Sequence, residues 1–518
     1  MSASSTSDLS TPAAPSVRTA SRTDPARVEL WFRRGLLVVS AMVAVVLLAS
    51  AGLMLWAQNE FAPPESVVSA HSQMLARDGT LYYSLKDYPY TVSAYMPIFY
   101  GLEATTIRLG IPAPTGGRLI TFTALLSLIA MCWQVVLLYT KDRLAAWIAA
   151  ILLAASPLMI YWGVVAQVDI LAVSLAMTAF YFYSRDHVQA TPHTLWLAGL
   201  FAGLALFTKQ TMVAIPTAIF LLLCLRRDWK RAAGFALGFG GGMIVLVLAI
   251  NAALDGRFLA NTVFANLNPM SLAKFATQAQ YLVGVCAGLL VVVAATLGFC
   301  FQKRTQAPLV YLACATLVFL ATAPKIGSDT NYQLELAATL AVVAGVGLHQ
   351  AEFFQKFFRG SQHWVTLLLL PLGVHVWIGA RVGVNMLLTR VATEQMFRSE
   401  IDGLRQYVPA SGAKVLSTDF NASARLHGRM DVEPLIYGLL VKAGRVDPEP
   451  VRRDLEHAAF STVILDHDVF KPNASDDLEL TALPPAQLDE IRRHYQLVAH
   501  VAGPYMDGAF VYKPKDSE

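Results

Sequence analysis

FAPPESVVSAHSQMLARDGTLYYSLKDYPYTVSAYMPIFYGL, residues 61–102, is a polar, tyrosine-rich stretch between two apolar segments. The apolar run before it, residues 35–57, is long enough to cross a bilayer. The stretch itself begins with the carboxylate of Glu65 and continues through Asp87. Long connections are uncommon unless they serve a function. We therefore expect residues 58–93 to form an outer loop that covers a site beside the membrane.

The composition indicates a polytopic membrane protein. The 518 residues are 55% hydrophobic and 15% charged, with a mean hydropathy of +0.49, whereas a soluble domain carries about 25% charged residues. Apolar segments recur as far as residue 388 and predict a helical bundle of roughly 11–13 spans. The net charge of +4 is small and spread out, so we expect no nucleic-acid partner. The five cysteines lie in apolar segments without metal spacing, and we expect neither a metal nor a cofactor.

Three regions follow from these patterns. Residues 1–28 are rich in Ser, Thr, Ala and Pro and are expected to be a disordered cytoplasmic tail. Residues 29–390 carry the apolar segments and form the predicted transmembrane domain. Residues 391–518 alternate between strand and helix patterns, which predicts a soluble α/β domain. We expect its strands at 413–420, 461–470, 495–501 and 508–514.

The distribution of basic residues predicts the sidedness of the chain in the cell membrane. Arginines before the first span place the N-terminus in the cytoplasm, and the basic clusters after Lys141 put the C-terminal domain outside. Three apolar segments lie between the N-terminus and Lys141, which is an odd number. Either the short segment 93–109 does not cross, or the Lys141 cluster is outside.

Two acids and two cations stand at membrane depth or close to it. Glu65 follows two prolines at a predicted helix start, where it is either a carboxylate stabilised by the helix dipole or a general base. Asp169 begins an apolar segment, and acids inside the membrane usually face a cavity or mark a function. Lys209 and Arg118 flank apolar runs, where they either snorkel to the interface or provide cations for a lipid phosphate.

Two further groups of polar side chains are candidates for lining a site. The loop APKIGSDTNYQLEL, residues 323–336, holds ionic, amide and phenolic groups in a short connection. The tyrosines of the first loop either stack on a sugar or mark the membrane interface. The run GFALGFGGG, residues 234–242, has no preceding strand and lies in an apolar segment, so helix packing is favoured over phosphate binding.

The serial order of these motifs resembles the bacterial GT-C class of integral-membrane glycosyltransferases. This class includes protein O-mannosyltransferases and the aminoarabinose transferase that acts on lipid A. The matching stretches are, in order, Glu65 with MLARDGTLYY (74–83), YMPIFYGL (95–102), GRLITF (117–122), SPLMIYW (156–162) with Gln167 and Asp169, GLFAGLALFTKQT (199–211) and KIGSDTNYQLEL (325–336). The resemblance implies a polyprenyl-phosphate-linked sugar as donor and a protein, lipid or glycan acceptor on the extracytoplasmic face.

The resemblance also implies roles for individual residues in a single displacement at the anomeric carbon. Glu65 is the candidate base, although members often carry Asp or an Asp-Glu pair where this chain has one Glu after two prolines. Asp87 is therefore a reserve, and Asp169 is a third catalytic candidate. Candidate phosphate ligands are Arg118, Lys209 and Lys325; candidate substrate contacts are Tyr82, Tyr83, Tyr95, Gln167, Asn331, Tyr332 and Glu335.

The alternative function is a transporter or lipid flippase of the cell envelope. Such proteins also use charges inside the membrane, but often as repeated halves with broken helices. No internal repeat is evident in this sequence, and the first loop has no counterpart in the second half.

Overall fold

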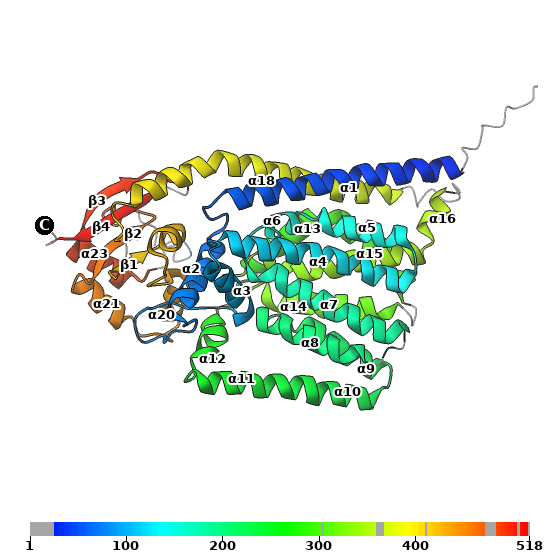
Figure 1. Ribbon diagram of the computed structural model, residues 1–518, viewed down its shortest axis with the longest axis horizontal. Helices are drawn as coiled ribbons and strands as arrows, with labels where there is room; N and C mark the ends of the chain where they lie inside the picture. Colours follow the sequence, from blue (N-terminus) through cyan, green and yellow to red (C-terminus); the bar gives the residue numbers. More distant parts are fainter. Residues whose placement is uncertain are drawn as a thin grey trace, which may run out of the picture.

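A bundle of helices leads into a small sheet at one end of the molecule (Figure 1). The computed structural model describes residues 25–189, 191, 193–301, 305–358, 367–409, 412–471, 483–504 and 508–515. The expected fold class, a mainly α membrane bundle with a C-terminal α/β domain, is confirmed.

Six helices within the described residues are long and apolar enough to cross a membrane. Their apolar windows follow from runs rich in Leu, Val, Ile and Ala with few charged residues. They are α1 (Pro25–Trp56), α4 (Thr115–Thr140), α10–η1–α11 (Trp229–Phe235, Ala236–Gly241, Gly242–Ala253), α13 with η3 (Leu272–Thr296, Leu297–Cys300), η4 with α15 (Thr330–Gln333, Leu334–Gln350) and α18 (Leu369–Leu404).

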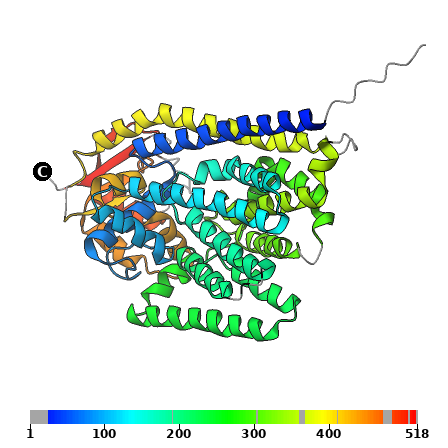
Figure 2. The same cartoon turned by 45° about the vertical axis from the view of Figure 1, so that its right-hand side comes forward.

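Within the described residues, six shorter helices and the 22-residue α7 complete the bundle and account for the difference from the expected 11–13 spans. They are α5 (Arg143–Ala154), α6 (Pro157–Trp162), α7 (Val168–Gln189), α8 (Thr194–Thr208), α9 (Ala214–Leu225), α14 (Gln306–Thr322) and α16 (Phe353–Phe358). Pro157 divides the expected segment 144–161 into α5 and α6, because proline cannot continue a helix hydrogen-bond ladder. The shorter helices lie beside the long ones in two views (Figures 1 and 2).

The centre of the bundle is α15, whose Ala- and Gly-rich surface is buried along nearly its whole length. Small side chains let neighbouring helices approach closely. At Gly345 an added Cβ would lie 2.7 Å from the Cβ of Ala149 in α5. The contact explains why this stretch carries glycine and alanine where larger apolar residues would suit a lipid-facing helix.

The start of the bundle resolves the odd number of segments before Lys141. Arg118 at the start of α4 donates to the carbonyls of Met54 and Ala57 at the end of α1, so α1 and α4 are antiparallel. Between them lie α2 (Pro63–Asp78) and α3 (Pro97–Arg108); α3 has 12 residues. Such a helix is about 18 Å long, short of a hydrocarbon core of about 30 Å. Lys141 therefore lies at the same end of the bundle as the start of α1.

The α/β domain contains a four-stranded mixed sheet in the order β1-β2-β4-β3. β1 (Lys414–Ser417) and β2 (Phe460–Leu465) are parallel, while β4 (Ala509–Pro514) is antiparallel to both β2 and β3 (Tyr495–Val501). All four strands lie where the alternating apolar patterns predict them. The helical elements of the domain are α19 (Phe420–Ala422), η5 (Ser423–His427), α20 (Pro434–Lys442), α21 (Glu449–Glu456) and α23 (Pro485–His494).

The two expected domain boundaries differ from the helix ends. α1 begins at Pro25, so residues 25–28 are helical, and residues 1–24 of the expected tail lie outside the described residues. α18 continues without interruption through residue 390 to Leu404. The change in composition at that point marks where one helix leaves the apolar bundle and carries the α/β domain.

The first loop connects the bundle to the α/β domain. It contains α2 and then an extended segment, in which Tyr90 pairs with Val432 as a parallel β-bridge. The Tyr90 backbone N–H donates to the Asp431 carbonyl over 2.8 Å, and the Glu433 backbone N–H donates to the Tyr90 carbonyl over 3.2 Å. α12 (Arg257–Thr262) and η2 (Phe264–Asn266) lie beside this junction (Figure 1). The segment after α2 thereby fixes the position of residues 431–433 over the end of the bundle.

Candidate functional site: a cavity between the bundle and the α/β domain

A cavity of about 520 Å³ opens where the α/β domain meets the bundle. We call it the junction cavity. Its size falls in the usual range for small-molecule sites, about 300–1,000 Å³. The lining residues come from the start of α2, the end of α8, the segments 262–270 and 321–327, and α20 with the residues before it. Four of the predicted site residues line it: Tyr95, Lys209, Lys325 and Tyr332.

Lys209 lies where α8 ends, because its backbone is extended and stops the helix. Its ammonium is bonded to the Asp169 carboxylate and lies 4.1 Å from the centre of the Tyr332 ring. The second oxygen of Asp169 accepts from Asn331 Nδ2 over 3.0 Å. Residues from three separate motifs therefore form one polar cluster at the wall of the cavity, and Lys209 and Tyr332 are its members that reach the lining.

Lys325 is the second cation of the junction cavity. It is half-buried, and its backbone pairs with Met270 across an antiparallel bridge. Within the described part of the chain, Lys325 takes part in no ion pair within 4.0 Å, unlike Lys209. An ammonium that faces a cavity without a carboxylate partner is suited to an anionic ligand.

Glu335 and Asn331 are close to the cavity but do not line it. They surround a small hollow of about 10 Å³ that shares Lys209 and Tyr332 with the junction cavity. Glu335 accepts a hydrogen bond from the Tyr311 hydroxyl over 2.9 Å. Gln167, directly before α7, accepts from its neighbour Val168 and also stays outside the lining.

Glu65 and Arg118 form a separate buried centre. The Arg118 guanidinium donates to Glu65 Oε1 over 2.8 Å and to Oε2 over 2.6 Å, and the side chains are 1% and 0% exposed. The backbone N–H groups of Phe61 and Ala166 donate to the same carboxylate over 2.8 and 2.7 Å. Each Glu65 oxygen thus has two donors, and neither Glu65 nor Arg118 lines the junction cavity. This geometry favours a structural role for both residues.

The remaining predicted residues lie on the first loop. Asp87 is exposed and does not line the cavity. The Tyr83 hydroxyl points to Asp78 over 3.5 Å, and the buried Tyr82 donates to the Tyr95 carbonyl over 3.0 Å. Tyr82 therefore supports the segment that brings Tyr95 to the cavity.

Sequence reasoning missed cavity residues that carry a phenol, an amide or a carboxylate, namely Tyr100, Gln210, Asn266, Asn268 and Glu433. The signal for the asparagines was the run ANLNPM in a predicted outer loop, because amides in a short loop beside the membrane suggest hydrogen bonding to a ligand. Gln210 directly follows Lys209. Glu433 gave no signal beyond a helix start in the α/β domain.

Glu433 is the carboxylate that reaches the cavity from the α/β domain. It is 2% exposed and caps α20, where one of its oxygens accepts from the Ile436 N–H over 2.6 Å. Burial raises the pKa of Glu433 to about 7. Burial also raises the pKa of Glu103 to about 7, but Ser69 and Ser72 occupy that carboxylate, and it does not line the cavity.

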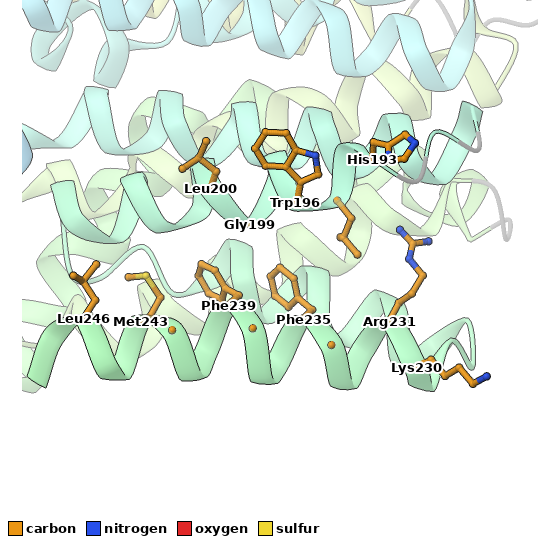
Figure 3. Close-up of a pocket in the computed structure, with 14 residues that line it drawn as sticks. His193, Trp196, Gly199, Leu200, Lys230, Arg231, Phe235, Phe239, Met243 and Leu246 are labelled. Carbon is orange, nitrogen blue, oxygen red and sulfur yellow. The ribbon is translucent and has the colours of Figure 1, made fainter. Parts of the chain in front are cut away.

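A second hollow, between α8 and the α10–α11 helix, is distinct from the junction cavity (Figure 3). Apolar side chains such as Trp196, Phe235 and Phe239 line it, with Lys230 and Arg231 at one end. Three glycines of the 234–242 run, Gly234, Gly238 and Gly242, border this hollow. An added Cβ on any glycine of the run would meet no atom within 4 Å, so the run does not form the expected helix seam. In the described residues, no group of three or more His, Cys, Asp or Glu could hold a metal ion.

Residues 108–253 match the family of dolichyl-phosphate-mannose-protein mannosyltransferases. No curated protein sequence matches the chain. Its fold is similar to ArnT from Cupriavidus metallidurans bound to undecaprenyl phosphate, with a TM-score of 0.61, 14% identity and coverage of 92% of this chain and 98% of that chain. It is also similar to the Archaeoglobus fulgidus oligosaccharyltransferase tethered with an acceptor peptide, with a TM-score of 0.52, 13% identity and coverage of 92% of this chain and 74% of that chain. The arabinofuranosyltransferase AftD from Mycobacteria is a third similar structure, with a TM-score of 0.51, 14% identity and coverage of 94% of this chain and 40% of that chain.

These structures are GT-C glycosyltransferases, and the chain has the GT-C fold. The resemblance indicated by the order of the sequence motifs is therefore confirmed at the level of the fold. Together with the six apolar helices, the fold defines an integral membrane protein.

Proposed function

We propose that the chain is a glycosyltransferase that moves a sugar from a polyprenyl-phosphate-linked donor to an acceptor on the extracytoplasmic face. The observation that carries the proposal is the pair of lysines, Lys209 and Lys325, in the junction cavity at the end of an apolar bundle. A lipid-linked donor needs such an arrangement, because its phosphate must find cations while its chain stays in the membrane. The similar ArnT structure binds undecaprenyl phosphate.

Lys325 is the main proposed ligand of the phosphate, because it faces the cavity without a carboxylate partner. Lys209 is the second ligand, and Asp169 and Asn331 hold its ammonium in place. Negative charge develops on the leaving phosphate as the sugar departs, and fixed cations stabilise that charge without reorganisation. Tyr95 and Tyr332 line the space where the sugar would lie.

The sidedness of the chain supports an extracytoplasmic reaction. Lys141 lies at the end of the bundle where α1 begins, and Arg33 and Arg34 belong to that first part of α1. The ring centres of Phe32 in α1 and Phe357 in α16 lie 5.4 Å apart, so the neighbouring Lys356 lies at this end too. Basic residues gather on the cytoplasmic side of membrane proteins. The α/β domain lies at the opposite end (Figure 1), and the junction cavity is lined in part by its residues. We assign both to the outer side.

The experiment measures acceptor-dependent release of free polyprenyl phosphate. Purified protein in lipid nanodiscs receives a panel of undecaprenyl-phosphate sugars with an envelope extract as acceptor, and mass spectrometry follows the product. We expect release by the wild type and at least a tenfold loss in Lys325→Ala, as for a charge-assisted hydrogen bond. Lys86→Ala is the matched control, because Lys86 is exposed on the first loop and does not line the cavity.

The alternative of a transporter or flippase predicts a different result in the same preparation. It would give no acceptor-dependent release with any donor, while labelled polyprenyl-phosphate sugar would cross the bilayer of proteoliposomes. That pair of results would refute the transferase proposal.

A further inference from the structure

We propose that Glu433, a residue of the α/β domain, is the general base that accepts the proton of the acceptor hydroxyl. The inference rests on the proposed sugar transfer and names the residue that would activate its second substrate. It assigns a chemical role to the α/β domain, for which the sequence predicts only a folded unit outside the membrane.

Glu433 differs in position from the other acids around the site. Among the described residues that line the junction cavity, Glu433 is the one with a carboxylate. The carboxylates expected from the sequence lie elsewhere: Glu65 is bonded to Arg118, Asp87 is exposed and Asp169 is bonded to Lys209 behind the wall. At the start of α2, the residues that face the cavity are the prolines 63 and 64, which carry no ionisable group.

Both the backbone and the side chain of Glu433 are held in place. Its backbone is fixed by the bridge between the first loop and residues 431–433, described above. Its side chain is fixed by hydrogen bonds from two backbone N–H groups of α20, those of Ile436 and Tyr437. A base that the backbone holds in one place at a cavity wall needs little reorganisation before proton transfer.

The cations and the acid of the junction cavity come from different domains. Lys209 and Lys325 belong to the bundle, whereas Glu433 belongs to the α/β domain, which packs over the end of the bundle (Figure 1). A phosphate bound by the lysines is thus anchored to the bundle, and an acceptor that enters below the α/β domain meets Glu433. An inverting displacement requires its leaving group and its base on different sides of the sugar.

The protonation state of Glu433 fits this role. Burial brings its pKa to about 7, and a general base is most effective when its pKa is close to the working pH. The ionisable groups that face the same cavity are the lysines 209 and 325 of the bundle and the tyrosines 95, 100 and 332. A bound phosphate would offset the charge of the two lysines, so binding of the donor would keep the pKa near neutrality.

The proposed step conserves atoms and charge. The acceptor oxygen forms a bond to the anomeric carbon while its proton passes to the Glu433 carboxylate. The bond between the anomeric carbon and the phosphate oxygen breaks, and its electron pair leaves with the polyprenyl phosphate. The product has the inverted anomeric configuration, and Glu433 returns its proton to water.

The other role of Glu433 is to cap α20, and the variants are chosen to separate it from the proposed one. Glu433→Gln retains an oxygen that can accept from the Ile436 N–H but cannot take a proton. Glu433→Asp retains both a carboxylate and a good cap. The matched control is Asp419→Asn, because Asp419 is a half-buried cap of the same domain that accepts from the Ala422 N–H over 2.9 Å and does not line the cavity.

The experiment measures kcat for sugar transfer and, separately, the affinity for undecaprenyl phosphate, in wild type and the three variants. We expect kcat to fall at least 100-fold in Glu433→Gln. The fall in kcat should be smaller in Glu433→Asp and small in Asp419→Asn. The affinity for undecaprenyl phosphate should change less than about twofold in all three variants. The rise of the rate through neutral pH should disappear in the residual activity of Glu433→Gln. Near-normal kcat in Glu433→Gln, or equal losses in Glu433→Gln and Asp419→Asn, would overturn the base but leave the transferase. No transfer by wild type with any donor would overturn the proposed function and the base together.

Discussion

Arg118→Ala is expected to unfold the junction between α1, α2 and α4 without acting on the reaction itself. The buried guanidinium is bonded to both Glu65 oxygens and to the carbonyls of Met54, Ala57 and Asn59, the last over 2.7 Å. The truncation would leave the Glu65 carboxylate buried with only backbone N–H donors. It would also remove a donor from each of the three carbonyls.

The magnitude follows from the burial of the pair. Removing one partner of a buried ion pair costs about 3–5 kcal/mol, because the other charge stays in a low dielectric. Each carbonyl left without a donor adds to this cost, though not additively. The expected loss is therefore at least about 3–5 kcal/mol, a large part of the roughly 5–15 kcal/mol by which proteins are typically stable. Arg77→Ala is the control, because its pair with Asp78 is largely exposed and worth about 0–1 kcal/mol.

Unfolding in detergent micelles by titration with SDS, followed by tryptophan fluorescence, measures these free energies. A double variant, Arg118→Met with Glu65→Leu, should lose less stability than the two single changes together, since no unpaired charge remains. Undecaprenyl phosphate should still bind to the folded fraction of Arg118→Ala. Normal stability combined with lost lipid binding would contradict the structural role, because it would make Arg118 a phosphate ligand as the sequence resemblance suggested.

Three further changes address other parts of the molecule. Asp169→Asn should lower the free energy of unfolding by about 3–5 kcal/mol, because it leaves the Lys209 ammonium without its carboxylate. Adding Lys209→Met to this variant should restore much of the lost stability in the same SDS titration. Gly379→Ala should lower the free energy of unfolding by at least about 1–3 kcal/mol, because the added Cβ would overlap the Ala155 carbonyl. Gly373→Ala is the control: it has open space around it and should lower the same free energy by less than about 1 kcal/mol. Equal effects of the two changes would contradict the close approach of α18 to Ala155. Burial raises the pKa of Glu60 from 4.5 to about 8, so its contribution to stability is present below pH 4.5 and is lost as the pH rises through 8. Glu60→Gln should therefore raise the thermal midpoint relative to wild type increasingly from about pH 5 to about pH 8, and a constant difference across that range would exclude Glu60 as the cause.

The membrane bundle and the sheet could be predicted because their signals are local. Apolar runs locate α1, α4 and α18, and alternation in segments such as 461–470 locates the strands. The short α3 was ambiguous, since its length alone could not show whether it crosses. Its place became clear only from Arg118, which joins the start of α4 to the end of α1.

The candidate site could be predicted only in part, because some of the residues that meet there lie far apart in the sequence. Lys209, Lys325 and Tyr332 were expected at a site and line the junction cavity. The partner of Glu65, however, is 53 residues away, and an acid at a helix start looks the same whether it is free or bonded to an arginine. Glu433 lies in another domain, and its approach to the cavity depends on the bridge to Tyr90, which no local pattern reveals.

Whether the junction cavity holds the lipid phosphate can be measured as the affinity for undecaprenyl phosphate, which requires neither the correct sugar nor the correct acceptor. Native mass spectrometry of wild type, Lys325→Ala and Lys86→Ala in nanodiscs would measure it at equal lipid concentrations. We expect binding by wild type and Lys86→Ala, with affinity at least tenfold lower in Lys325→Ala through loss of a charge-assisted contact. Equal affinity in all three proteins, or no binding by wild type, would contradict the assignment of the junction cavity as the site of the lipid phosphate.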